Sequence, residues 1–131
     1  METIINIRGT EYTLRFEKQN YAHGHNLAIE VLCWNKEFEF WERYGLLTVN
    51  LPNTVLAENR AFLDSNKCSE EILKWIFDNN YAQIIGQGQS GFCTYPLVEF
   101  SAEFLEMIAA YKKSNMIQIW ICQLCHVAFY F

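Results

Sequence analysis

The chain has 131 residues, of which 51% are hydrophobic and 16% aromatic, so it can bury the core of one domain and is unlike a disordered chain. Its formal net charge is −5, from 10 basic and 15 acidic residues. This balance opposes direct nucleic-acid binding, which needs a concentrated positive face, and favours a partner with a basic groove.

The first half of the chain alternates apolar and polar residues as β-strands do. Residues 3–16 predict two strands around a tight turn at Arg8-Gly9-Thr10, and residues 26–34 predict a third. Residues 36–52 predict a further strand that Gly45 breaks or bulges and that Pro52 ends. We therefore expect an antiparallel sheet in this half.

The second half predicts two helices separated by strand-like segments. The first helix is expected after Ser69, a natural N-cap, with Asn79-Asn80 as a left-handed end. The second covers residues 101–113, with Ser101 as its N-cap. Residues 81–86 and 92–100 between them are rich in β-formers.

Together these elements predict an α+β fold. We expect a mainly antiparallel sheet of about five to seven strands with two helices packed on one face. Residues 1–113 would form a single domain, and the apolar C-terminal tail 114–131 would pack on it. The expected core residues are Leu47, Val49, Leu51, Ile72, Ile76, Phe92, Phe104 and Ile108.

The tail 114–131 contains no Lys, Arg, Asp or Glu. Its pattern permits a buried strand or helix, an oligomer interface that would give a homodimer, or membrane insertion. Polar residues such as Asn115, Gln118 and His126 argue against a lipid-facing helix. The N-terminus lacks the pattern of a secretory signal, so we expect a cytoplasmic protein without membrane contact.

Residues 86–91, GQGQSG, have the G-x-G-x-x-G spacing of a phosphate-binding loop. A dinucleotide site needs a helix directly after the glycines, because the helix N-terminus holds the pyrophosphate. Here the β-formers of residues 92–95 follow, and Pro96 comes next. We therefore interpret the segment as a glycine-bearing hairpin loop.

The five cysteines are Cys33, Cys68, Cys93, Cys122 and Cys125. An odd number without a secretory signal is typical of reduced thiols in the cytosol. The stretch CQLCH at 122–126 matches a haem-attachment motif, but proteins of that type are exported, and zinc would need further ligands. We expect buried thiols, no metal and no cofactor.

Few residues are candidates for catalysis. Ser90 or Cys93 could be the nucleophile of a hydrolase, but no histidine or carboxylate is tied to either by spacing. His23 and His25 flank Gly24, which indicates a solvated turn more than a metal site.

The densest acidic cluster is Glu37, Glu39 and Glu42, on the predicted fourth strand. Charge on an edge strand blocks unwanted pairing. The functional alternative is an acidic ridge that docks into a basic groove, so these three are the candidate partner-binding residues.

Four further residues are candidates for loop organisation or ligand binding. They are Asp64, Asn66, Ser90 and Tyr95. Asp64 and Asn66 are expected to organise the loop before the first helix through side-chain to backbone hydrogen bonds.

Four phrases carry a family resemblance. They are LLTVNLP (46–52), NRAFLDSN (59–66), WIFDNN (75–80) and SGFCTYPLVEF (90–100). In this order they resemble a small uncharacterised family of Gram-positive bacteria, often carried on phages, plasmids and conjugative elements. The likeness covers about residues 20–105, and the stretch 64–67 departs from the family's Asp-Thr-Asn-Asn-like sequence at two places.

The resemblance supplies no activity, but it implies an accessory protein of a mobile element. Some small proteins in that setting inhibit host defence, including CRISPR nucleases. Our leading hypothesis is a non-enzymatic protein that binds another protein; a basic partner or one that binds nucleic acid would suit the acidic chain. The alternatives are a small-ligand or nucleotide sensor using residues 86–95, and a small hydrolase using Ser90 or Cys93.

Overall fold

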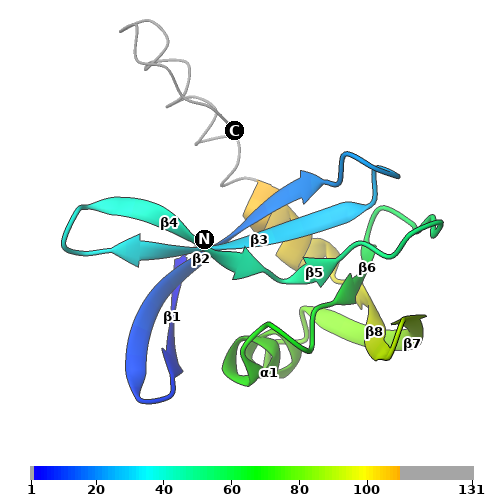
Figure 1. Ribbon diagram of the computed structural model, residues 1–131. Helices are drawn as coiled ribbons and strands as arrows, with labels where there is room; N and C mark the ends of the chain where they lie inside the picture. The colour runs from blue at the N-terminus through cyan, green and yellow to red at the C-terminus, as the bar shows by residue number, and fades with distance from the viewer. Residues whose placement is uncertain (1, 110–131) are drawn as a thin grey trace, which may run out of the picture.

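The computed structural model describes residues 2–109, which form two antiparallel sheets and two helices (Figure 1). Sheet A has the strand order β1-β2-β3-β4, and sheet B has the order β5-β6-β8-β7. The strands are β1 (Glu2–Ile7), β2 (Thr10–Asn20), β3 (Leu27–Asn35), β4 (Phe40–Leu46), β5 (Thr48–Val49), β6 (Arg60–Leu63), β7 (Ala82–Ser90) and β8 (Cys93–Phe100). The helices are α1 (Glu70–Asp78) and a second helix over residues 102–109.

The α+β class, the antiparallel pairing and the two helices are confirmed, but the single sheet is wrong. The strands form two sheets of four, where one sheet of about five to seven was expected. Residues 36–39 form a turn, and the following strand bends at Leu47 and continues as β5 in the other sheet. Alternation along a strand does not reveal which sheet the strand joins. The packing of both helices on one face is not confirmed.

Sheet A consists of two hairpins that diverge. Arg8 and Gly9 join β1 to β2 with φ values of 51° and 86°, the type I′ pattern that suits a two-residue hairpin. Pairing of β2 with β3 ends at Leu14 and Cys33, while each hairpin continues beyond that point. The β1–β2 and β3–β4 ends therefore point in different directions (Figure 1).

Leu47 and Thr48 join the two sheets. The backbone N–H of Leu47 donates to the carbonyl of Ile29 at 2.8 Å, and its own carbonyl accepts from the N–H of Asp64 at 2.9 Å. The Thr48 hydroxyl accepts from the N–H of Ile29 at 3.2 Å and lies 2.8 Å from the Tyr21 hydroxyl. A buried polar corner thus fixes where the chain leaves sheet A.

A single cluster of buried hydrophobic residues draws on both sheets and both helices. The ring of Phe104 lies 5.8 Å from Phe16, 5.1 Å from Tyr81 and 5.6 Å from Phe100, measured between centroids. Trp75 of α1 stacks on Phe16 at 5.4 Å. These aromatic contacts join the helix over residues 102–109 to β2, β8 and the segment that follows α1.

Most of the predicted core is confirmed. The buried residues are Leu47, Leu51, Ile72, Ile76, Phe104 and Ile108. Val49 is only half-buried. The prediction for Phe92 is wrong: its exposed fraction is 106%, because it lies in the β7–β8 turn instead of at the start of β8.

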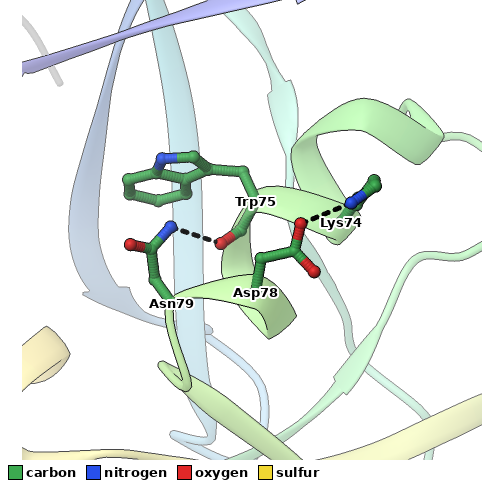
Figure 2. Close-up of polar contacts among 4 residues, drawn as sticks. All are labelled: Lys74, Trp75, Asp78 and Asn79. Carbon is green, nitrogen blue, oxygen red and sulfur yellow. Dashed lines mark hydrogen bonds and ion pairs between the residues drawn. The ribbon is translucent and has the colours of Figure 1, made fainter.

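Both ends of α1 match their predictions. Ser69 Oγ accepts from the N–H of Ile72 at 3.3 Å, and Asn80 has a φ of 58°. The N–H groups of Asn80 and Tyr81 donate to Phe77 and Ile76, which is the Schellman pattern. Figure 2 shows the last turn, where Asn79 Nδ2 donates to the Trp75 carbonyl and Lys74 pairs with Asp78.

We expect Ser69→Ala to lower the free energy of unfolding by about 1 kcal/mol, because the N–H of Ile72 loses its acceptor. Urea unfolding followed by circular dichroism measures the change. Ser65→Ala, in the exposed loop before the helix, is the control and should unfold like the wild type. Equal stability of all three proteins would contradict the cap.

Several predictions lie outside the described residues. They are the packing of the tail 114–131, its role in a homodimer, the domain boundary at 113, and the state of Cys122, Cys125 and His126.

Candidate functional site

The three candidate partner-binding glutamates lie at the free end of the β3–β4 hairpin. Glu37 and Glu39 are in the turn between the strands, and Glu42 is on β4, the outer strand of sheet A. The expectation that all three share a strand is therefore wrong. Asn35 Oδ1 accepts from the N–H groups of Glu37 and Phe38, both at 3.0 Å, and this Asx-type contact turns the chain before Phe40.

The same hairpin exposes aromatic residues that sequence reasoning placed on a strand without marking them as surface. The exposed fractions of Phe38 and Phe40 are 70% and 44%. Trp34 and Trp41 pair across the strands with ring centroids 5.3 Å apart. We call residues 34–42 the aromatic–acidic hairpin.

Arg15 of β2 supports the base of this hairpin. Its guanidinium carbon lies 4.3 Å from the centroid of a Trp41 ring, within the range of a cation–π contact. Burial lowers the pKa of Arg15, and Glu17 and Glu2 offset part of that shift. The guanidinium stays protonated at neutral pH, so it can fix the orientation of Trp41.

A groove of about 610 Å³ lies where the β1–β2 hairpin diverges from β4. Tyr12 and Tyr44 line it with ring centroids 5.9 Å apart, together with the loop before α1. Burial raises the pKa of the Tyr44 hydroxyl, and Tyr12 adds to the shift. The volume of the groove is within the range of small-molecule sites.

Two of the four loop or ligand candidates lie beside this groove. Asn66 lines it, and Asp64 lines a neighbouring pocket of about 300 Å³. Asp64 Oδ1 accepts from the N–H of Lys67 at 3.2 Å, as expected of a residue that organises the loop. Asn66 is exposed in the same turn, and its side chain makes no hydrogen bond to another described residue, so its predicted role in organising the loop is wrong.

Cys68 also lines the groove, and its thiol is protected. Burial raises its pKa to about 11, with Asp64 adding to the shift. At pH 8 only about 0.1% of such a thiol is the reactive thiolate. We expect iodoacetamide to modify Cys68 much more slowly than the exposed Cys93, with a rate that rises about tenfold per pH unit up to pH 10.

Mass spectrometry of the two cysteine peptides measures both rates in one sample. In denaturant the two thiols should react alike, which is the internal control. Labelling of Cys68 as fast as Cys93 in the folded protein would contradict the assigned burial.

Ser90 and Tyr95, the other two candidates, lie on the β7–β8 ribbon. After the turn at Gly91 and Phe92, β8 begins at Cys93, so a strand and not a helix follows the glycines, as predicted. Gly91 alone has a positive φ, 60°, at the first turn position, which is the type II′ pattern. The hairpin is confirmed, but Gly86 and Gly88 lie within β7 and not in a loop.

The histidine turn is confirmed. His23 and His25 lie in the exposed turn between β2 and β3. Within residues 2–109, no hydrogen bond joins Ser90 or Cys93 to a histidine or a carboxylate. Over the same range, no three His, Cys, Asp or Glu side chains gather to hold a metal ion.

The thiols of Cys33, Cys68 and Cys93 are free. In the described part of the chain, no helix has the length and hydropathy needed to cross a membrane.

Over residues 2–109, two four-stranded antiparallel sheets, two helices and an exposed aromatic–acidic hairpin form an α+β structure. The chain belongs to the DUF4313 family, a domain of unknown function, whose model matches residues 15–120. An uncharacterised family was expected; its link to Gram-positive bacteria and mobile elements stays a prediction. No curated protein and no solved structure matches the chain.

Proposed function

We propose that this protein is a non-enzymatic binding protein that occupies a partner protein through the aromatic–acidic hairpin. The observation that carries the proposal is the exposure of Phe38 and Phe40 beside Glu37, Glu39 and Glu42 at the free end of sheet A. Aromatic anchors supply much of the affinity at protein interfaces, whereas surface charge sets the association rate.

The hairpin is suited to this role because its base is held and its end is exposed. Trp41 contacts both Trp34 and Arg15, so the strands keep a fixed geometry below the turn. Phe38 projects from the turn that Asn35 organises. A pre-organised anchor loses little conformational entropy when it binds.

The partner that fits best is a basic protein, for example a protein that binds nucleic acid. A net charge of −5 favours such a partner at long range. In the mobile-element setting that the family resemblance implies, the partner would be a cytoplasmic host defence nuclease, such as a CRISPR nuclease, and binding would inhibit it.

We expect reversal of Glu37, Glu39 and Glu42 to lysine to slow association with such a partner and to flatten its salt dependence. Phe38→Ala should instead accelerate dissociation, because a desolvated anchor is lost. The wild type and the variants are used as parallel baits in a lysate of the natural host. Binding kinetics are then measured with the captured protein, and inhibition is measured if that protein is a nuclease.

The matched control reverses three exposed glutamates away from the hairpin, Glu58, Glu103 and Glu106, and gives the same net charge. It should bind at nearly the wild-type rate. If both triple variants bind alike and Phe38→Ala has no effect, the hairpin is not the docking site.

A second candidate function is a small-ligand sensor that uses the groove between Tyr12, Tyr44 and the loop before α1. The groove has a volume of about 610 Å³, which is large enough for a small molecule and favours this function. A ligand at a hundredfold excess over its Kd would stabilise the fold by about 2.7 kcal/mol. A thermal-shift screen of nucleotides and metabolites tests this, with Tyr44→Ala as the variant that should lose any shift.

A further inference from the structure

Among the residues that the structure describes, strand β7 is an edge strand of sheet B. It is the last strand in the order β5-β6-β8-β7, and nearly all its residues are exposed. The exposed fractions of Ile84 and Ile85 are 58% and 39%. An edge strand presents unpaired N–H and C=O groups that can pair with another strand.

This edge differs from the others in charge. Between Asp78 and Glu99 the chain has no acidic or basic residue and no histidine. The edges of sheet A carry Glu2 on β1 and Glu42 with Arg43 on β4, and β5 has only two residues. Charged side chains are a common protection of edge strands, and β7 lacks this protection.

We propose that β7 pairs with β7 of a second copy of this chain, antiparallel about a twofold axis, so that two copies of sheet B form one continuous sheet. Each chain carries a net charge of −5, so two copies repel one another over most of their surfaces. An uncharged strand is where this repulsion is least. A twofold axis also uses the same patch on both copies, so one surface suffices.

The side chains of β7 are self-complementary. Ile84, Gln87 and Gln89 lie opposite Val98, Pro96 and Thr94 of β8, so they share one face of the sheet. A glutamine amide both donates and accepts hydrogen bonds, so glutamine can pair with glutamine, whereas a carboxylate repels its own copy.

The geometry of β7 points to where the axis lies. An irregularity separates Ile84 from Gly86, but residues 86–90 pair with β8 in unbroken register. With the axis at Gly88, Gln87 of one copy faces Gln89 of the other. Gly86 and Gly88 add no side chains of their own to that segment, although Phe62 and Leu51 occupy the space where a Cβ of residue 88 would lie.

The test is the mass of the full-length chain in solution, measured by analytical ultracentrifugation over a range of concentrations. We expect a dimer, and we expect Gln87→Glu with Gln89→Glu to raise its dissociation constant at least about tenfold, because carboxylates then face each other. Both residues are exposed, so the variant should fold, which circular dichroism checks. Mixing it with a Gln87→Lys, Gln89→Lys chain should restore dimers as heterodimers.

The matched control adds the same charge elsewhere, with Asn53→Asp and Val55→Glu in the exposed loop before β6. It should dimerise almost as the wild type does. A wild-type monomer at every concentration overturns the proposal. The proposal is also overturned if the wild type dimerises and the Gln87→Glu, Gln89→Glu variant has the same dissociation constant. The dimer interface would then lie on another surface.

Discussion

Phe104→Ala is expected to lower the free energy of unfolding by about 3–5 kcal/mol, the usual cost of removing a fully buried phenylalanine ring. The ring contacts Phe16, Tyr81 and Phe100, which come from β2, the segment after α1 and β8. Its removal leaves a cavity where these elements meet. Urea unfolding at low temperature measures the loss, because the variant would be only marginally stable when warm.

Phe38→Ala is the matched control for this prediction, because it removes the same side chain from a site that is 70% exposed. It should change the free energy of unfolding by no more than about 0.5 kcal/mol. Similar losses in the two variants would show that Phe104 is not the centre of the core. Phe104→Leu, which keeps most of the buried volume, should lose much less than Phe104→Ala.

These two phenylalanines illustrate what the sequence could reveal. Phe104 and Ile108 are four residues apart behind a serine N-cap, and this helical spacing is enough to predict a buried face. Phe38 and Phe40 alternate with glutamates and were predicted as strand residues. The prediction is confirmed for Phe40, the first residue of β4, but Asn35 accepts two backbone hydrogen bonds and places Phe38 in a turn.

The division into two sheets was less accessible to sequence reasoning. Gly45 was expected to break or bulge its strand, and the register of β3 with β4 does shift beside it. The change of sheet at Leu47, however, depends on hydrogen bonds to Ile29 and Asp64, which are remote in sequence. Similarly, the groove forms because two hairpins diverge, and no local pattern encodes that divergence.

Gly88→Ala is the second large expected effect. A Cβ at this position would collide with the Phe62 ring and lie 2.8 Å from Leu51 Cδ1. Phe62 and Leu51 are both buried, so they have little room to move. We expect a loss of about 1–3 kcal/mol in the free energy of unfolding, the range for overpacking a well-filled site. Gly88, the middle glycine of the G-x-G-x-x-G segment, would then be required for packing, and the likeness to a phosphate-binding loop would be coincidental.

Gly86→Ala is the matched control, two residues away on the same strand. There a Cβ would lie 3.6 Å from Leu97 Cδ2, an ordinary contact. Alanine also reduces the entropy of the unfolded chain, so this variant should be as stable as the wild type or gain up to about 1 kcal/mol. Combining Gly88→Ala with Phe62→Leu should recover part of the loss, because the smaller side chain makes room for the added methyl group. Equal stability of the two alanine variants, with no coupling to residue 62, would mean that β7 does not approach Phe62 as closely as described.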